Sequence, residues 1–427
     1  MRMVLNEGDR LKVEGPASIM LREGDVSILG KRLRVREQVT IAKSKIVLLE
    51  AEAKSIVEVN LGDEGKIEKI EDPVVPYEWR VAAENILKEK MPIKVIVLGG
   101  VDTGKNAFTT YLSNLAIARK LRVLVIDEDL GQSEFSPPTT IGMALIKRAI
   151  TSLSRAKSME MYFVGSTNPM GVIHRVMIGI KHLLEKAEQH GYDILIINTD
   201  GWVYGDEARD FKLGIIEVVR PDIIVAIQRV NEIEHLLMPF TSQKWVKIIR
   251  LLTPPSFKQR TLEDRKLIRE SMYRKVFSNS RIVKTSLEDV SIMYSFYASS
   301  FPLNKSDMHQ LVKILGEEPI YGGRIPEGLV LVLKRTPDEQ KLETIKSVFN
   351  VGEIKVIRCG MERGIIAGLY DSNGNFVGLG VIKEIDYRKR IVKLLVNTEN
   401  EIAMIKLGKI KLDENFRERA KIPLWYI

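Results

Sequence analysis

Cysteine is almost absent from this chain: Cys359 is the only one among 427 residues. A single thiol cannot form an intramolecular disulfide bond and cannot build a cysteine-based metal cluster. The five histidines are scattered, without the H-E-x-x-H spacing of a zinc site. The composition therefore excludes disulfide-stabilised folds and resident metal sites of these types.

Long apolar stretches are also missing. The sequence has no uninterrupted apolar run of about 18 residues, the length that a membrane-spanning helix requires. The first ten residues include Arg2, Glu7, Asp9 and Arg10 and contain no apolar signal core. We therefore expect a cytoplasmic protein that has no membrane partner.

The charge is not balanced. Lys and Arg number 65 against 56 Asp and Glu, which gives a formal net charge of +9. This excess fits a polyanionic partner such as nucleic acid. The mixed-charge surface of a thermophile protein gives a similar composition and also explains the scarcity of cysteine. Composition alone leaves the two interpretations open.

Three segments differ in their pattern, which is compatible with the two or three domains expected at this length. Residues 1–85 are predicted to form a small β-sandwich-like domain, because short apolar segments alternate with polar turns about every ten residues. In residues 86–301 strands and helices alternate, which predicts an α/β doubly wound parallel sheet. Residues 302–427 are predicted to form a β-rich domain.

The central sheet should be built from strands that are apolar throughout, because parallel strands are buried on both faces. The strands expected are residues 94–98, 122–126, 193–198, 223–228 and 247–251. Helical patterns cover residues 78–89, 106–120, 170–190 and 207–219.

The most informative motif joins the first of these strands to a helix. An apolar run leads into Gly99-x-x-x-x-Gly104-Lys105, the glycine loop that wraps polyphosphate. Backbone N–H groups and the helix N-terminus face the phosphates, and the lysine reaches the β/γ-phosphates. A glycine turn that merely joins strand to helix is the alternative. The nucleotide contacts predicted are Gly99, Gly100, Val101, Asp102, Thr103, Gly104, Lys105, Asn106 and Ala107.

One residue of this loop departs from the pattern. The position after the lysine normally carries a Ser or Thr hydroxyl for Mg²⁺, and here it is Asn106. An amide oxygen can ligate Mg²⁺, but it is bulkier and lies further from the backbone than a hydroxyl. Nucleotide binding is therefore expected, any metal ion should arrive with the nucleotide, and turnover is a separate question.

Carboxylates follow the second strand, in Asp127-Glu-Asp-Leu-Gly-Gln132. Asp127 and Asp129 point to the same side of an extended strand. At the carboxyl end of a strand beside a phosphate loop they can hold Mg²⁺ through water or accept a proton from an attacking hydroxyl. The alternative is a solvated acidic turn. Asp200, after a later strand, competes with Asp127 for the metal on spacing alone.

Two further motifs flank the same expected edge of the sheet. Trp202, between glycines just beyond a strand, can stack on a nucleobase, or it can fill a domain interface. In Gly165-Ser-Thr-Asn-Pro169, Thr167 and Asn168 either cap the following helix or contact the substrate.

A basic helical segment follows Pro254-Pro255. Arg265 and Arg269 are four residues apart and share a helix face, so their guanidinium groups can close over transferring phosphoryl oxygens. An ordinary salt-bridged surface helix is favoured when the segment is taken alone, because it also carries Glu263, Asp264 and Glu270.

Taken in order, the phosphate loop, D-x-D-x-G-Q, T-x-P, N-T-x-G-W-V and the arginine-rich segment resemble the RNA 5′-hydroxyl polynucleotide kinases. That family includes the kinase subunit of the eukaryotic pre-mRNA cleavage complex and its archaeal relatives. The resemblance covers the middle of the chain and extends more weakly to both flanks, where the family has a small β domain and a β-rich domain. The composition is typical of an archaeal, thermophilic member.

The resemblance implies transfer of the ATP γ-phosphate to the 5′-hydroxyl of an RNA end, with Mg²⁺ or Mn²⁺ as cofactor. DNA ends are left open as substrates, and RNA-processing proteins are expected partners. The implied catalytic residues are Lys105, Asp127, Arg265 and Arg269, and the implied metal ligands are Asn106, Asp127 and Asp129.

The resemblance also implies an acceptor site. Thr167 and Pro169 match the family's T-x-P clasp, which sandwiches the terminal base with Trp202, and Gln132 lies near the metal and its waters. Arg260 is in register with a further family arginine. Glu14 and Lys45 are candidates for contacts with adenine.

Two other functions compete with a kinase. One is a scaffold that holds ATP for RNA-processing partners with little turnover, and Asn106 is its main support. The other is a P-loop NTPase that works as a switch or partition motor, in which the T-x-P and G-W-V elements have no role.

Overall fold

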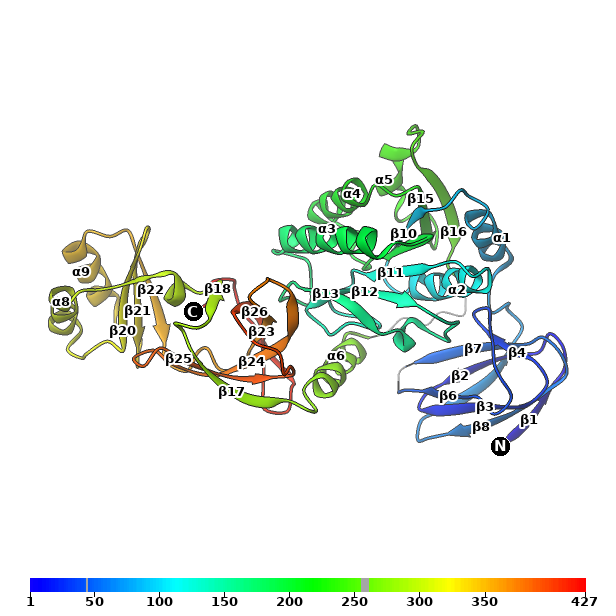
Figure 1. Cartoon of the computed structure of the whole chain (residues 1–427), viewed down its shortest axis with the longest axis horizontal. Helices are drawn as coiled ribbons and strands as arrows, with labels where there is room; N and C mark the ends of the chain where they lie inside the picture. The colour runs from blue at the N-terminus through cyan, green and yellow to red at the C-terminus, as the bar shows by residue number, and fades with distance from the viewer. Residues whose placement is uncertain (44, 255–260) are drawn as a thin grey trace. The chain divides into compact units, whose positions relative to one another are not determined.

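The computed structural model describes residues 1–43, 45–254 and 261–427 (Figure 1). The chain forms two compact units. The first comprises Met1–Tyr162 and Asn168–Ile268, and the second comprises Phe163–Thr167 and Arg269–Ile427. Among the described residues, no helix combines the length and the apolar character that a membrane crossing needs.

The first unit begins with two sheets that share one apolar core. Side chains alternate between core and solvent along the strands, as expected of sheets with one buried face; Leu11 and Val13 are buried, as is Ile19. One sheet contains β1 (Arg2–Leu5), β8 (Ser55–Leu61), β3 (Ala17–Glu23) and β6 (Gln38–Ile41). The other contains β5 (Lys31–Arg32), β4 (Val26–Ile28), β7 (Ile46–Ala51), β2 (Arg10–Glu14) and β9 (Lys66–Ile70).

A seven-stranded sheet forms the rest of the first unit. Its order is β13 (Ser158–Phe163), β12 (Thr140–Ile146), β11 (Val123–Asp127), β14 (Ile194–Asn198), β10 (Ile93–Gly99), β15 (Ile223–Gln228) and β16 (Lys247–Leu252). The pairs among β11, β14, β10, β15 and β16 are parallel, which confirms the predicted α/β core. β12 runs antiparallel to β11, so the sheet is mixed at this edge, which the sequence analysis did not predict.

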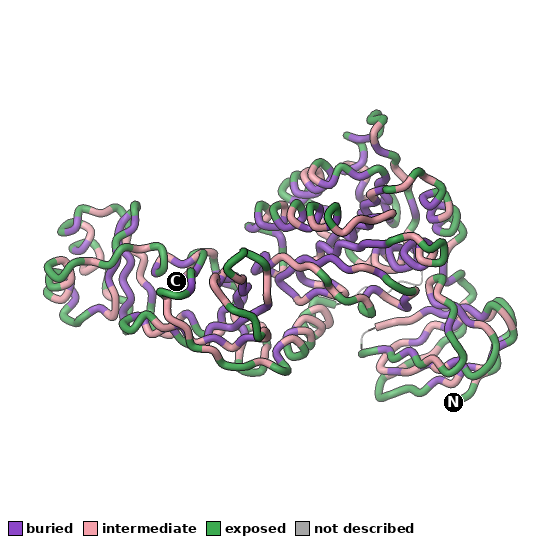
Figure 2. Tube along the Cα trace, viewed as in Figure 1, coloured by how far each residue is buried: buried purple, intermediate pink, exposed green. Residues whose placement is uncertain are grey.

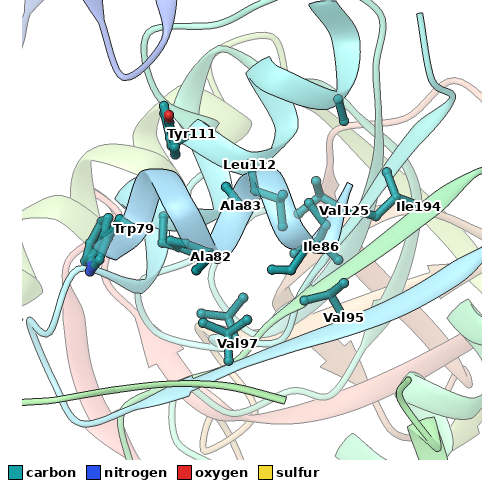
Figure 3. Packing of buried hydrophobic residues seen from close by; sticks show 14 of the residues in the cluster. Trp79, Ala82, Ala83, Ile86, Val95, Val97, Tyr111, Leu112, Val125 and Ile194 are labelled. Carbon is teal, nitrogen blue, oxygen red and sulfur yellow. The ribbon is translucent and has the colours of Figure 1, made fainter. Parts of the chain in front are cut away.

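Helices cover both faces of this sheet. α1 (Tyr77–Ile86) and α2 (Lys105–Ala118) share a buried cluster with alternate residues of the strands, and Figure 3 shows this packing. Gly179 of α3 (Ile173–His190) lies against Ile141 of β12. Because Ile141 points away from Ala144, which belongs to that cluster, α3 covers the opposite face. The trace through the central strands is buried in Figure 2. The other helices of this part are α4 (Asp206–Val219) and α5 (Glu234–Leu237), with 3₁₀ turns at Leu153–Arg155 and Met238–Phe240.

The second unit is rich in strands, as the fold-class prediction required. One sheet has the order β17 (Arg281–Ser286), β25 (Ile391–Val396), β24 (Phe376–Asp386), β23 (Ile365–Tyr370), β26 (Met404–Leu412) and β18 (Ser291–Met293), and β27 (Glu418–Lys421) pairs with β26. The other contains β19 (Phe301–Pro302), β20 (Tyr321–Ile325), β21 (Gly328–Leu333) and β22 (Glu353–Arg358). α6 (Leu262–Val276) leads into this unit, which also contains α7 (Phe296–Ser299), α8 (Lys305–Leu315) and α9 (Glu339–Phe349).

The three-domain division stays a prediction. The boundary predicted after residue 85 falls within α1, and that predicted after residue 301 falls within β19. β17 pairs with β25, so strands of the second unit begin before residue 302. β17 was not predicted because its six residues are all exposed or half-buried and show no apolar alternation.

Candidate active site

The glycine loop lies between β10 and α2, as predicted. Gly104 caps α2 with a φ of 100°, a left-handed conformation that suits glycine. A Cβ on Gly99 would lie 2.5 Å from the carbonyl oxygen of Ile227, so this position also requires glycine. The Thr103 hydroxyl donates to the Gly100 carbonyl at 3.0 Å. The loop therefore leads directly into a helix N-terminus, the arrangement that binds phosphate.

Lys105 folds back over this loop. Its Nζ donates to the carbonyl oxygens of Gly99 at 3.0 Å and Gly100 at 2.6 Å. Burial lowers the pKa of Lys105 to about 8, although Asp129 and Asp200 favour its charged form. The ammonium group is therefore desolvated and close to the backbone that would surround a phosphate.

Two arginines contact residues of the loop. Arg229, which follows β15, donates through Nη2 to the carbonyl oxygens of Val101 at 3.0 Å and Asp102 at 3.1 Å. Arg265 places Nη2 3.0 Å from Oδ2 of Asp102. The predicted lid arginine therefore contacts the phosphate loop itself. Arg229 was not predicted, because its sequence context gives no motif.

Asp127 is fully buried at the end of β11, so the solvated-turn alternative is wrong. Its Oδ2 accepts hydrogen bonds from the Ser133 hydroxyl at 2.9 Å and the Glu134 backbone N–H at 2.8 Å. Its Oδ1 accepts from Asn198 Nδ2 at 2.9 Å. Burial and the nearby Asp129 carboxylate raise the pKa of Asp127 to about 7. The carboxylate is thus fixed in position and able to exchange a proton near neutral pH.

Asn106 belongs to the same polar network. Its Oδ1 accepts from Asn198 Nδ2 at 3.0 Å, and its Nδ2 donates to Oε1 of Glu134 at 3.2 Å. Glu134 also pairs with Lys45 of the N-terminal sheets, at 2.7 Å. Lys45 therefore reaches the side of the phosphate loop, whereas Glu14 pairs with Lys12 within the N-terminal sheets.

Charged side chains beside the loop interact with one another. Burial raises the pKa of Asp127 to about 7 and that of Glu128 to about 8, so not all of the carboxylates here are ionised near neutral pH. Groups of three or more His, Cys, Asp or Glu arranged to hold a metal do not occur among the described residues. Mg²⁺ keeps several waters and binds mainly through one or two carboxylates and phosphate oxygens, and Asp127 and Asp129 supply two carboxylates in this region. The charged groups are Asp127, Glu128, Asp129, Asp200, Lys105 and Lys212.

Trp202 is half-buried in the loop after β14. Its ring centroid lies 5.9 Å from that of Phe211, with an angle of 37° between the planes. The backbone N–H of Trp202 donates to Oδ1 of Asp200 at 2.9 Å. The same Asp200 oxygen lies 2.6 Å from Lys212 Nζ, which disfavours Asp200 as the competing metal ligand.

Gln132 and Asp129 form a turn beside this site. Asp129 Oδ1 accepts from the backbone N–H groups of Gly131 at 3.1 Å and Gln132 at 2.8 Å. Gln132 Nε2 donates to the Arg265 carbonyl oxygen at 3.1 Å. The D-x-D-x-G-Q motif is therefore connected to the start of the arginine-bearing helix α6 (Leu262–Val276).

Comparison with known proteins identifies the family. Residues 99–279 match the model of the mRNA cleavage and polyadenylation factor CLP1 P-loop. A polyribonucleotide 5′-hydroxyl-kinase of Methanocaldococcus jannaschii is 30% identical over 81% of this chain and 94% of its own length. The chain belongs to this kinase family. A second relative of the same name, from Pyrococcus abyssi, is also 30% identical, over 81% of this chain and 94% of its own.

A solved structure shares the fold of this family member. The Clp1p–Pcf11p complex includes a chain that matches with a TM-score of 0.65 at 13% identity, over 96% of this chain and 97% of that one. The predicted family resemblance and the predicted fold class are thus confirmed.

The structure places the two predicted lid arginines of this polynucleotide kinase family member in different settings. Arg265 belongs to the first unit and contacts Asp102, as described above. Arg269 belongs to the second unit, where Nε and Nη2 bind Glu418 at 2.7 and 2.9 Å. Arg265 and Arg269 both pair with residues outside α6. This argues against the alternative of a surface helix whose salt bridges lie only within the helix. Arg260 lies outside the described residues.

The T-x-P segment does not cap the following helix, so that alternative is wrong. α3 begins at Ile173, whereas Asn168 Oδ1 accepts from the backbone N–H of Met170 at 2.8 Å. Pro169 is buried, and its carbonyl accepts from Val172. Thr167 is half-buried in the second unit, and the clasp roles of Thr167 and Pro169 stay predictions.

A buried lysine of this family member was missed from the sequence. Lys212 is fully buried and lies on α4 in the apolar stripe that also contains Ala208, Phe211 and Ile215. Lys212 lies four residues after Ala208 and three before Ile215, on the apolar face of the helix. This spacing was the available signal, because a charge on the core face of a helix requires a buried partner.

Proposed function

We propose that this protein is an ATP-dependent polyribonucleotide 5′-hydroxyl kinase. The observation that carries the proposal is Asp127, a buried carboxylate that accepts hydrogen bonds from Ser133, Glu134 and Asn198 at 2.8–2.9 Å and has a pKa raised to about 7. Asp127 and Val97 are both Cα partners of Asn198, so β14 alone separates the end of β11 from β10 and its phosphate loop. A general base beside a phosphate loop is the arrangement that phosphoryl transfer to a hydroxyl needs.

The donor side is formed by the glycine loop. We assign the triphosphate to the backbone of residues 99–107, with the Lys105 ammonium group on the β- and γ-phosphates. Lys105 already lies on the carbonyl oxygens of Gly99 and Gly100, so its ammonium group is beside the backbone to which we assign the phosphates.

The transfer is a single displacement. As the 5′-oxygen of the RNA forms its bond to the γ-phosphorus, the bond between that phosphorus and the β,γ-bridging oxygen breaks, and ADP leaves. Asp127 accepts the proton of the 5′-hydroxyl. Arg265 is proposed to neutralise the equatorial oxygens of the transferred group. The same role for Arg269 requires that it first leave Glu418, to which both Nε and Nη2 bind in this structure.

A divalent cation would be held next to the loop. Asn106, Asp127 and Asp129 are the proposed ligands, directly or through water. Mg²⁺ or Mn²⁺, when bound, neutralises charge on the β- and γ-phosphate oxygens. Asn106 Oδ1 can accept a second interaction besides that from Asn198, because an amide oxygen has two lone pairs.

The acceptor side is proposed to hold the terminal nucleotide of the RNA. Trp202, which is half-buried and packs against Phe211, is proposed to stack on the terminal base, and stacking on an aromatic ring is tolerant of base identity. Contacts of Thr167, Pro169 and Gln132 with the substrate are further proposals. DNA ends and RNA-processing protein partners are further proposals.

The scaffold alternative is not favoured. The relatives from Methanocaldococcus jannaschii and Pyrococcus abyssi carry the name of an active kinase. Asn106 is also held by Asn198 and Glu134, which supports an adapted metal site rather than an abandoned one.

The test is transfer of labelled phosphate from ATP to paired RNA and DNA oligonucleotides that carry 5′-hydroxyl ends, with Mg²⁺ and with Mn²⁺. We expect the wild-type protein to label RNA and the Lys105→Ala variant to lose roughly a hundredfold or more in rate, because an electrostatic contact in the transition state is removed. Lys120→Ala, at an exposed residue beyond α2, is the control. Absence of labelling with both metals and at several temperatures would refute the proposal.

A further inference from the structure

A buried lysine lies behind the proposed acceptor site. Lys212 of α4 is 0% exposed. Its Nζ lies 2.6 Å from Asp200 Oδ1 and 3.2 Å from Glu128 Oε2. Lysine is rarely buried completely, and then only with paired charges. The nearby carboxylates hold the lysine charged and keep its pKa high despite burial. Lys212 therefore connects three segments: α4, the end of β11 and the loop after β14.

The two carboxylates that bind Lys212 are attached to groups with proposed roles. Asp200 Oδ1 also accepts the backbone N–H of Trp202 at 2.9 Å. Glu128 directly follows Asp127, and its Oε2 accepts the backbone N–H of Asp200 at 2.8 Å. Lys212 thus anchors two segments, each through one carboxylate. Asp200 connects it to the loop that carries Trp202, and Glu128 connects it to the end of β11, which carries the proposed general base Asp127.

The residue before Lys212 contributes to the same arrangement. Phe211 packs against the Trp202 indole, with 5.9 Å between the ring centroids, and Lys212 Nζ lies 4.7 Å from the centroid of the Phe211 ring. Consecutive residues of α4 therefore hold both the ring and the backbone of Trp202. The position of Trp202 therefore depends on α4 as well as on its own loop.

We propose that Lys212 is a positioning residue for the acceptor nucleotide. It fixes Asp200, and through Asp200 the backbone of Trp202, so that a base stacked on the indole brings its 5′-hydroxyl to Asp127. The inference rests on the proposed kinase function and deepens it, because it makes a buried ion pair responsible for the alignment of the RNA end.

The key variant is Lys212→Met, which keeps an unbranched apolar chain and removes the ammonium group. We expect the KM for RNA to rise about tenfold, the loss of roughly one stacked base. The KM for ATP should change less than twofold, because the phosphate loop is untouched. A merely structural defect would instead lower the fraction of active protein without separating the two KM values.

A spectroscopic measurement reports the same role directly. An RNA with 2-aminopurine as its 5′-terminal base should lose fluorescence when that base stacks on Trp202. At saturating RNA, we expect Lys212→Met to quench the 2-aminopurine fluorescence less than the wild-type protein does. Trp202→Phe gives a further reference. Arg209→Met is the matched control, because Arg209 lies on the same helix with an exposed side chain and pairs only with the exposed Asp206 among the contacts identified in the described residues.

Removing the Lys212 ammonium group leaves the buried carboxylates of Glu128 and Asp200 without their cation, and this can prevent folding. Circular dichroism would reveal such a loss of structure. In that case the measurements are made on the triple variant Lys212→Met, Glu128→Gln, Asp200→Asn, which has no uncompensated charge and keeps an acceptor for the Trp202 N–H. The same rise in the KM for RNA is expected. An unchanged KM for RNA and unchanged quenching in the variant that folds would overturn the role of Lys212. Failure of the wild type itself to phosphorylate RNA would instead overturn the proposed function.

Discussion

At the scale of single residues, the state of Asp127 is set by what surrounds it. Burial and the Asp129 carboxylate raise its pKa to about 7, while donors from Ser133, Glu134 and Asn198 hold it in place. A base works only when deprotonated. The rate of transfer should therefore increase with pH up to about 7 and then level off. A pH–rate profile of kcat/KM for RNA at constant Mg²⁺ measures this.

The matching variant is Asp127→Asn. It keeps the size of the side chain and removes the base, so we expect transfer to fall by about 10²- to 10⁴-fold. Binding of ATP should persist, since the phosphate loop is unchanged. A variant that retained wild-type transfer, or a wild-type rate that is flat between pH 5 and 8, would show that Asp127 is not the base.

Asn106 provides a second test at this scale. Asn106→Thr restores the hydroxyl usual at this position but loses the bonds to Asn198 and Glu134. If the native site is active, we expect the transfer rate of Asn106→Thr to lie within about tenfold of the wild type. A near-inert wild type with a large gain in Asn106→Thr would support the scaffold function instead. Titration of the rate with Mg²⁺ would separate weaker metal binding from slower chemistry.

The polar network could not be predicted at this scale. The glycine loop, Asp127 and Trp202 have local motifs, and all were found in the sequence. Asn198 meets Asp127 only because β11 and β14 pair in register at those residues, and Lys45 reaches Glu134 across 89 residues of sequence. Such contacts depend on tertiary register, which no local pattern encodes.

At the scale of elements, strands with strong apolar patterns were predicted within one or two residues. β15 has the predicted bounds, and β10, β11, β14 and β16 differ by one residue at one or both ends. β12 is also apolar but was missed, because it lies between a proline-rich turn and a polar segment without a clear helix partner. Short strands with polar faces, such as β17, give no periodic signal.

Helix α6 is the element whose role the structure changes most. Arg265 Nη2 lies 3.0 Å from Oδ2 of Asp102 in the phosphate loop. The Arg265 carbonyl oxygen accepts a hydrogen bond from Gln132 Nε2. We expect Arg265→Ala to lower kcat by about 10²-fold with less effect on the KM for ATP, since a guanidinium that neutralises the transferred group acts in the transition state. Steady-state kinetics with both substrates measures the split.

Two comparisons make this prediction specific. Arg265→Lys should remain strongly impaired, because a lysine cannot reproduce the planar, bidentate contact of a guanidinium. Arg274→Ala, at an exposed residue of the last turn of α6, should behave like the wild type. Equal losses in Arg265→Ala and Arg274→Ala would point to a general effect of charge rather than to a lid residue.

At the scale of the whole molecule, the net charge of +9 admits two explanations: attraction of RNA, or the mixed-charge surface of a thermophile protein. Salt dependence separates them, because binding of a polyanion releases counterions and weakens steeply with salt. If the basic surface serves RNA, the KM for a 20-nucleotide RNA should rise about tenfold or more between 50 and 200 mM salt. The KM for a dinucleotide, which contacts the acceptor site alone, should change little over the same range. Equal salt dependence for the long and short acceptors would mean that the positive charge lies outside the path of the RNA and belongs to the stability of the surface.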